Sequence, residues 1–169
     1  MGKNVTQFDL SGLSDDKALA IAAYGEAVAA YRYIVLSEKA PTDKLKLSFQ
    51  QMVQTEYAQR DTLQKLLAEL FPSACFYLTG RDKAMVCVGP RLLDARDDAR
   101  FDEAMRLTIA SEKRSISFYN RYLPIARDPR VSQTFSRFAA DGLIRVRELR
   151  LLFQSAGKQI NESCPIIPC

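Results

Sequence analysis

The chain has 169 residues, of which 47% are hydrophobic and 26% are charged, a composition typical of one soluble globular domain. Lys and Arg number 24 against 20 Asp and Glu, and the charges are interspersed, so we expect neither a nucleic-acid nor a membrane partner. The sequence contains no His. This excludes Ser-His-Asp and Cys-His triads, imidazole general bases and every metal site that needs an imidazole ligand.

Targeting signals and cysteine spacing suggest an ordinary intracellular protein. The first ten residues, MGKNVTQFDL, lack the apolar run of a signal peptide, and no stretch approaches the roughly 18 apolar residues of a membrane span. We therefore expect a cytoplasmic location. The four cysteines show no C-x-x-C spacing: Cys75, Cys87, Cys164 and Cys169. We interpret them as reduced surface thiols, with a Cys164–Cys169 disulfide or a link to a second chain as alternatives.

Four segments carry inward-facing residues at alternating steps of three and four, which predicts amphipathic helices. They span 15–39, 43–70, 101–123 and 129–156. Helix-boundary signals agree with these ranges. The boundary residues are Ser14 and Asp128-Pro129 at two starts, and Pro41, Pro124 and Gly157 at three ends. Each segment is long enough to form one helix of a bundle.

The connections between these segments predict the topology. Short connections near Pro41 and Pro124 join the helices into two antiparallel hairpins. Residues 71–100 separate the hairpins and can run the length of a bundle. We therefore predict an all-α four-helix bundle over 15–156, with a long crossover between the second and third helices and tails at 1–14 and 157–169. Within the crossover, a small β-hairpin around residues 79–83 and an extended strap are the alternatives.

The two halves of the chain repeat each other at an offset of 86 residues. The matching pairs include Glu26 with Glu112, Tyr33 with Tyr119, Phe49 with Phe135, and Leu63 with Leu149. A duplicated helical hairpin explains this offset.

On each of the four predicted helices, the inward-facing residues form an apolar stripe. Near the middle of each helix, residues that are not large and apolar interrupt this stripe. The interrupting residues are Glu26, Glu56, Gln59, Glu112, Gly142 and Arg145. They lie at one level, because positions 30 residues apart, such as Glu26 and Glu56, face each other on antiparallel helices. A buried carboxylate is costly unless it is paired or bound to a metal. We therefore expect the three glutamates, Gln59 and Arg145 to meet in the bundle interior.

Over residues 15–156 this arrangement resembles the ferritin-like fold and, within it, the rubrerythrin-like proteins. The resemblance implies a di-iron site that takes one Glu from each of two helices and a Glu-x-x-His pair from each of the other two. Glu26 and Glu112 match the single glutamates, and Glu56 matches the Glu of the first pair. Gln59, Gly142 and Arg145 stand where the first His, the second Glu and the second His would be. No rubredoxin-like cysteine knuckle follows.

We interpret the cluster as a vestigial metal site in which Arg145 is the internal counter-ion, because a guanidinium is always charged and cannot bind a metal. Three alternatives remain open. They are one divalent ion (Fe, Mn or Zn) on Glu26, Glu56, Gln59 and Glu112, an atypical two-metal site, and a shifted register that turns Asp141 or Glu148 inward. The remaining negative charge can be balanced by shared protons or by Arg60 or Arg114 reaching in.

Two function hypotheses follow. The first is a non-catalytic binding or structural protein without a cofactor, which has lost the standard di-iron site. The second is a metal-dependent oxidoreductase, peroxidase or iron-handling protein that uses a carboxylate-only site. The resemblance also implies a homodimer. Apolar crossover residues that need a cover favour it as well: Phe71, Phe76, Met85 and Val88.

Overall fold

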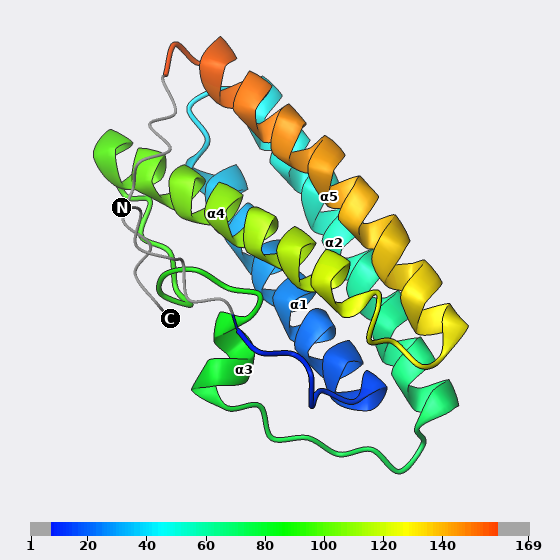
Figure 1. Cartoon of the computed structure of the whole chain (residues 1–169). Coiled ribbons are helices and arrows are strands. Elements are labelled where there is room, and N and C mark those ends of the chain that lie inside the picture. The colour runs from blue at the N-terminus through cyan, green and yellow to red at the C-terminus, as the bar shows by residue number, and fades with distance from the viewer. Residues whose placement is uncertain (1–7, 159–169) are drawn as a thin grey trace, which may run out of the picture.

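A computed structural model describes residues 8–158. The alternative Cys164–Cys169 disulfide lies outside the described residues, and Cys87, which was interpreted as a surface thiol, is buried, whereas Cys75 is exposed. Five helices follow one another along the chain (Figure 1): α1 (Asp15–Lys39), α2 (Asp43–Leu70), α3 (Gly80–Ala84), α4 (Asp98–Tyr122) and α5 (Pro129–Ser155). The described part contains no strand. The predicted all-α fold class is confirmed.

Side chains at the helix starts explain where the long helices begin. The N-caps that accept a backbone hydrogen bond are Thr42, Asp97 and Asp128. Ser14 occupies the N-cap position of α1, but its side chain makes no capping bond. Instead, the buried carboxylate of Asp15 accepts from the Tyr122 hydroxyl at 2.7 Å and from the Asp128 N–H at 2.8 Å. The start of α1 is therefore fastened to the turn between α4 and α5.

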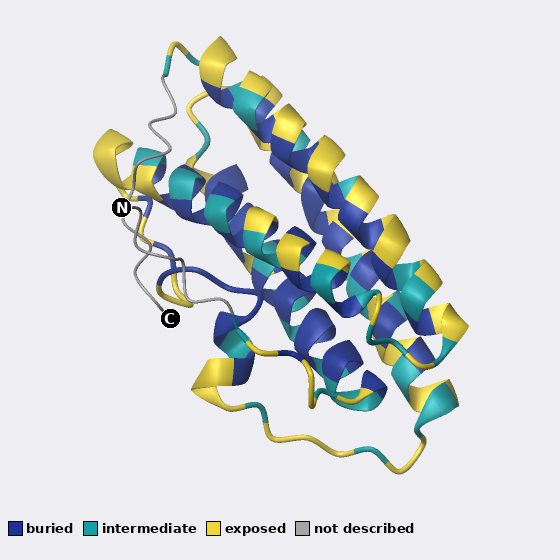
Figure 2. Ribbon diagram, in the orientation of Figure 1, coloured by how far each residue is buried: buried dark blue, intermediate teal, exposed yellow. Residues whose placement is uncertain are grey.

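The four long helices pack as two hairpins, α1 with α2 and α4 with α5, and α1 also packs against α4. Buried residues line the space between them (Figure 2). Two aromatic pairs repeat in the two halves: Tyr33 with Phe49 at 6.2 Å between ring centroids, and Tyr119 with Phe135 at 4.9 Å. These rings hold the two tyrosines beside the middle of the bundle, where the polar residues were predicted to meet.

The crossover holds a short helix where a β-hairpin was one alternative, and that alternative is wrong. The Thr79 hydroxyl accepts from the Asp82 N–H at 3.2 Å, and the Asp82 carboxylate accepts from the Thr79 N–H at 2.8 Å. This reciprocal capping box satisfies the free N–H groups of a helix start, so the chain turns into α3 rather than into a hairpin.

After α3, residues 85–97 contain no helix or strand and include a buried run, residues 85–89. We call residues 84–90 the strap. Side chains of α1 and α4 donate hydrogen bonds to its carbonyl groups. Met85 and Val88 are buried within the chain itself. These two residues therefore need no second chain to cover them.

Helix α1 is the most apolar of the long helices. By length and composition it is long and apolar enough to cross a membrane, with a mean hydropathy of 1.3. In the bundle, 61% of its most apolar window is buried against the rest of the chain. A core helix of a soluble bundle has the same length, composition and burial.

Candidate functional site at the centre of the bundle

Each long helix contributes one charged side chain to the middle of the bundle. Glu26 comes from α1, Glu56 from α2, Glu112 from α4 and Arg145 from α5, and all four are buried. Glu56 is fully buried, with 0% of its surface exposed. Charged groups of this kind need partners, because an isolated buried charge is strongly unfavourable.

Arg145 supplies the positive charge, as the sequence predicts. Its Nε lies 2.7 Å from Oε1 of Glu56 and 3.1 Å from Oε1 of Glu112. The predicted salt bridge is therefore confirmed, and it reaches two glutamates on two helices. Burial alone would lower the pKa of Arg145, but the carboxylates of Glu112 and Glu56 outweigh it and hold that pKa above its ordinary value.

Two tyrosines donate hydrogen bonds to the other glutamates in a crossed pattern. The Tyr33 hydroxyl on α1 donates to Oε1 of Glu112 on α4 at 2.7 Å. The Tyr119 hydroxyl on α4 donates to Oε1 of Glu26 on α1. Each half of the repeat therefore supplies the donor for the carboxylate of the other half. Burial, and then the neighbouring carboxylate, raises the pKa of both phenols well above the ordinary value.

Glu56 is the carboxyl group that is hardest to ionise. Burial raises its pKa well above the ordinary value, and the nearby charges of Glu26 and Glu112 raise it further. Arg145 acts in the opposite direction but does not reverse the shift. Within the described residues, neither oxygen of Glu56 has an aligned hydrogen-bond partner, so its contact with Arg145 is an ion pair only. A proton on Glu56 therefore relieves the repulsion among three close carboxylates.

Gln59 was predicted to meet the glutamates in the bundle interior, and it is buried there, but its hydrogen bond runs to Asp141. Its side chain is buried, but its amide Nε2 donates to Oδ2 of Asp141 at 3.2 Å. The partner lies one turn before Arg145 on α5, at the edge of the bundle. Because the Asp141 carboxylate accepts from this amide, a neutral donor links α2 and α5 here, in addition to the ion pair of Arg145 with Glu56.

The other proposed charge sources do not reach the centre. Arg145 faces inward, Glu148 is exposed and Asp141 is half-buried beside Gln59, so α5 keeps the register that places Arg145 at the centre. Arg60 pairs with Asp61 at 2.7 Å on the surface of α2. Arg114 donates to the carbonyl groups of Ala84 and Cys87 in the strap. Arg60 therefore does not balance the glutamates, and the described hydrogen bonds of Arg114 run to the strap.

Gly142 stands where the resemblance places a second Glu, and the space beside it is filled. A Cβ atom built on Gly142 would lie 2.7 Å from Cγ1 and 3.1 Å from Cδ1 of Ile116. Real Cβ atoms do not approach other carbons this closely, so a side chain here requires Ile116 to move. Ile116 of α4 therefore occupies the place of the missing carboxylate and lets α4 and α5 approach closely.

Sequence reasoning missed Arg32, the second guanidinium in the interior. Arg32 is fully buried on α1, one residue before Tyr33. It donates to Oγ of Ser111 at 2.6 Å and to the carbonyl groups of Val88 and Pro90 at 2.7 and 2.9 Å. Within the described chain no carboxylate lies at salt-bridge distance. The sequence does show an arginine in an otherwise apolar helix. Its partners include backbone carbonyl groups, however, and these cannot be recognised from residue types.

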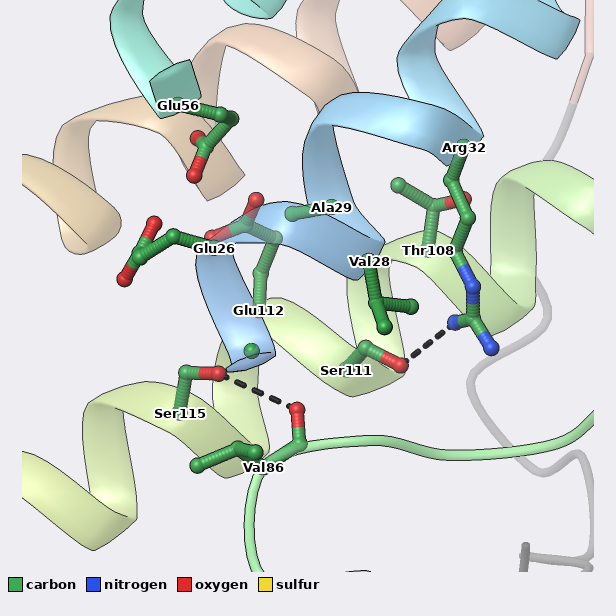
Figure 3. A pocket seen from close by; sticks show the side chains of 11 residues that line it. Glu26, Val28, Ala29, Arg32, Glu56, Val86, Thr108, Ser111, Glu112 and Ser115 are labelled. Carbon is green, nitrogen blue, oxygen red and sulfur yellow. Dashed lines mark hydrogen bonds between the residues drawn. The ribbon is translucent and has the colours of Figure 1, made fainter. Parts of the chain in front are cut away.

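A small cavity joins these groups (Figure 3). Its volume is about 10 Å³, enough for about one water molecule. It lies between α1, α4 and the strap, and Figure 3 shows the three glutamates on one side and Arg32 on the other. The lining residues are Gly25, Glu26, Val28, Ala29, Arg32, Glu56, Val86, Thr108, Ser111, Glu112 and Ser115.

A family model described as Rubrerythrin matches residues 17–142, which is more than half of the chain. The chain belongs to the rubrerythrin family. The matched range includes α2, α3 and α4 completely, α1 from its third residue onward and the part of α5 that ends at Gly142. It therefore includes Glu26, Glu56 and Glu112, while Arg145 lies just beyond it. No curated protein matches the chain.

Two solved structures share the fold of this rubrerythrin-family chain. A hypothetical protein from Pyrococcus furiosus has 16% identity and a TM-score of 0.73, with 90% of this chain and 97% of that chain covered. The manganese catalase KatB from Anabaena PCC7120 also has 16% identity, with a TM-score of 0.65 and coverage of 99% and 83%. At this identity the likeness concerns the fold alone.

The described residues of this family member differ from the di-iron ligand set that the resemblance implies. Such a centre has four carboxylates and two imidazoles around two metal ions that keep coordination positions open. Here the Arg145 guanidinium contacts two of the three carboxylates, Gln59 bonds to Asp141, and Ile116 fills the space at Gly142. Within residues 8–158, no three His, Cys, Asp or Glu side chains are arranged to hold a metal ion.

Proposed function

We propose that this rubrerythrin-family protein has replaced the di-iron centre with a metal-free ionic network and acts as a non-catalytic structural or binding protein. The observation that carries the proposal is the position of Arg145, whose Nε lies 2.7 Å from Glu56 and 3.1 Å from Glu112. A guanidinium has no lone pair for a metal and is charged at every physiological pH. The Arg145 guanidinium forms ion pairs with the carboxylates that would bind a metal, and its positive charge repels a cation.

The neighbouring substitutions support the same proposal. A redox-active pair of metals needs anionic and imidazole ligands that leave positions open for oxygen or peroxide. Gln59 is neutral and bonded elsewhere, and a side chain at Gly142 would collide with Ile116. Three positions therefore differ from the di-iron ligand set in ways that oppose metal binding. Gln59 bonds to Asp141, Gly142 has no side chain and its space is filled, and Arg145 places a cation where a ligand would be.

A structural role for the network follows from the helices that it connects. Arg145 links α5 to α2 and α4, and the crossed tyrosine bonds link α1 to α4. Buried polar networks can specify one arrangement of packed helices because other registers leave charges unpaired. We infer that the network keeps the four helices at one level in place of a metal.

The first experiment measures metal binding and peroxide consumption together. Purified protein is incubated anaerobically with excess Fe²⁺ or Mn²⁺, desalted and analysed for metal per chain. We expect less than about one ion per chain, because the carboxylates are already paired with Arg145. Two tightly bound ions, or peroxide consumption that disappears in Glu56→Ala, would favour the alternative function, a metal-dependent oxidoreductase with a carboxylate-only site.

The second experiment restores the missing ligands. A variant carrying Gln59→His, Gly142→Glu, Arg145→His and Ile116→Ala should bind about two iron ions per chain, because it regains the ligand types and the space. The control variant keeps Ile116 and carries the other three substitutions. We expect it to bind less iron and to melt at a lower temperature, since the side chain introduced by Gly142→Glu collides with Ile116. Equal behaviour of the two variants would contradict our account of Ile116.

A further inference from the structure

An open groove runs between α2 and α5, which lie side by side (Figure 1). Its volume is about 640 Å³, which is far larger than the central cavity. Its lining residues are Ser48, Gln51, Met52, Thr55, Asp141, Ile144, Arg145, Glu148, Leu151 and Leu152. Among them, Arg145 also belongs to the central network, where its guanidinium pairs with Glu56 and Glu112. The groove is therefore a surface feature outside the candidate site.

Large apolar side chains line and border the groove. Ile144 and Leu151 on α5 line it and are 56% and 60% exposed, and Met52 lines it from α2. Leu47 on α2 is 60% exposed and lies one turn before Gln51, a lining residue. The outward face of α5 is exposed along most of its length (Figure 2). Apolar side chains that gather at a groove indicate a contact surface.

The charges that the groove offers to a ligand are negative. Asp141 and Glu148 line it, and within residues 8–158 neither carboxylate forms a salt bridge. Asp141 accepts only from the neutral amide of Gln59 in that part of the chain. The side chain of Arg145 is 8% exposed and its charge is already paired, while Arg147 is exposed but does not line the groove. On a chain of net charge +4, this groove therefore favours a ligand with positive charge as well as apolar surface.

The spacing of these groups along α5 indicates the shape of the ligand. Asp141 and Glu148 are seven residues apart, which is two helical turns or about 10.5 Å. Ile144 lies between them and Leu151 follows one turn after Glu148, so carboxylates and apolar side chains alternate along the groove. Another α-helix that lies along the groove presents its own residues at the same seven-residue spacing on one face.

We propose that this groove binds an amphipathic helix of a partner protein, with apolar residues on one face and Lys or Arg seven residues apart beside them. The two basic residues pair with Asp141 and Glu148. The apolar residues between them pack against Ile144, Leu151 and Met52, as in other complexes in which a helix lies in an apolar groove. An acidic helix of the same pattern is repelled, because its carboxylates lie opposite the two acids of the groove.

Two synthetic helices test the sign of the charge. The first is a capped peptide of about 21 residues, long enough to form a helix, with Leu at alternating steps of three and four and Lys at every seventh position. The second has Glu in place of each Lys. Both carry a fluorophore, and fluorescence anisotropy measures their binding to the full chain. We expect the Lys peptide to bind with a dissociation constant below about 100 μM and the Glu peptide to bind at least about 10-fold more weakly.

Two pairs of variants place the binding in the groove. Glu148→Lys should weaken binding of the Lys peptide by about 10-fold and strengthen binding of the Glu peptide, because it reverses one charge of the groove. Its matched control is Glu103→Lys, since Glu103 is exposed on α4. Ile144→Ser should weaken binding of both peptides by about 10-fold, because it removes an apolar contact. Its matched control is Leu92→Ser, since Leu92 is 67% exposed in the crossover. Circular dichroism checks that all four variants are folded.

Three outcomes would overturn the proposal. The first is equal binding of the Lys and Glu peptides, and the second is an equal effect of a groove variant and its control. The third is a wild-type dimer that Ile144→Ser dissociates in sedimentation velocity, because a second copy of the chain would then fill the groove. Metal binding does not enter these measurements, so this proposal and the proposed function fail separately.

Discussion

Burial and the neighbouring carboxylates raise the pKa of Glu56, which favours its neutral form at the centre of the bundle. With Glu56 neutral, the carboxylates of Glu26 and Glu112 face two guanidinium groups, Arg145 and Arg32, which line or adjoin the same cavity. Burying two carboxylates together with two guanidinium groups is far less unfavourable than burying a set of groups with a net charge. The tyrosine hydrogen bonds therefore stabilise the charges of Glu26 and Glu112, and the raised pKa of Glu56 limits the negative charge beside them.

The proton on Glu56 predicts a specific dependence of stability on pH. Its folded-state pKa is raised above the unfolded value of about 4.5, so its contribution to stability is fully present below that pH and is lost as pH rises. A Gln side chain does not titrate. We expect the stability of Glu56→Gln relative to wild type to increase by about 1.4 kcal/mol per pH unit from about pH 5 up to the folded-state pKa of Glu56 and to level off above it. Urea unfolding at a series of pH values measures this difference.

The control for this experiment is the exposed Glu69→Gln, because Glu69 lies on the surface of the same helix. Its stability relative to wild type should change little over the same pH range. A flat profile for Glu56→Gln would mean that Glu56 is ionised in the folded protein.

Arg145 is the cation that contacts two glutamates of the network. In Arg145→Ala, Glu56 and Glu112 lose their cationic partner while they remain buried, and we expect the free energy of unfolding to fall by about 3 to 5 kcal/mol. Lys65→Ala is the matched control, because the Lys65 side chain is 78% exposed and makes only a surface pair with Glu69. Its effect should stay below about 0.5 kcal/mol. Chemical denaturation at pH 7 compares the two, and equal losses would contradict the role of Arg145.

At the scale of elements, the strap is held by donors from the helices beneath it. Arg32 on α1 bonds to Val88 and Pro90, and Ser115 on α4 bonds to Val86 at 3.1 Å. The Val88 N–H donates to Ser111 at 2.9 Å. A segment without helix or strand can be buried only when its backbone groups find such partners. The strap therefore covers the cavity as a fixed part of the fold.

We expect Arg32→Met to free the strap while leaving the bundle folded. Met keeps an unbranched side chain of similar length but cannot donate to the carbonyl groups of Val88 and Pro90. Amide hydrogen exchange at residues 86–89 should become about 10-fold faster or more, with little change in α2 and α5. Arg91→Met is the control, because Arg91 is exposed. If both variants leave the strap amides equally protected, Arg32 is not its anchor.

The contact between α4 and α5 at Gly142 can be tested by a double-mutant cycle. Gly142→Ala gains about 1 kcal/mol of helix propensity, but its Cβ overpacks against Ile116 at a cost of about 1 to 3 kcal/mol. We expect the single variant to be destabilised. In an Ile116→Ala background the collision is gone, so Gly142→Ala should stabilise by up to about 1 kcal/mol. The same sign in both backgrounds would show that Ile116 does not fill this space.

At the scale of the whole molecule, the helices could be predicted from sequence because their signals are local. Helices α1 and α2 begin and end where the periodicity and Pro41 place them, and α4 begins three residues earlier than expected, at Asp98. The sequence also predicted which charged residues meet: Glu26, Glu56, Glu112 and Arg145. They lie at the same height on the inward faces of four packed helices, so their side chains point into the same part of the interior. Their role as metal ligands stays a prediction.

Other features depended on contacts that are not local. The orientation of Gln59 is decided by Asp141, which lies 82 residues away, and the role of Arg32 by the course of the strap. The α3 capping box was missed for a different reason. Its Thr79-Gly80 start also suits a turn, and only the Asp82 side chain distinguishes a helix start from a hairpin.

The repeat of two hairpins raises the question of whether each half unfolds alone. Bonds of the network cross between the halves: Tyr33 to Glu112, Tyr119 to Glu26, and Arg145 to Glu56. We therefore expect one cooperative transition for both halves, in which far-UV circular dichroism and the near-UV signal of the tyrosines coincide. The chain has seven Tyr and no Trp, so the near-UV signal comes largely from the tyrosines, including the two of the network.

Tyr33→Phe and Tyr119→Phe test this coupling from the two sides. Each removes one hydroxyl that donates to a buried carboxylate, which should lower the free energy of unfolding by about 1.5 to 3 kcal/mol. Because each bond joins both halves, we expect either variant to shift the whole transition and to keep it single. Tyr31→Phe is the control, since Tyr31 is 39% exposed on α1. Two separate transitions, or a shift confined to one probe, would show that the hairpins are independent units and that the network does not join them.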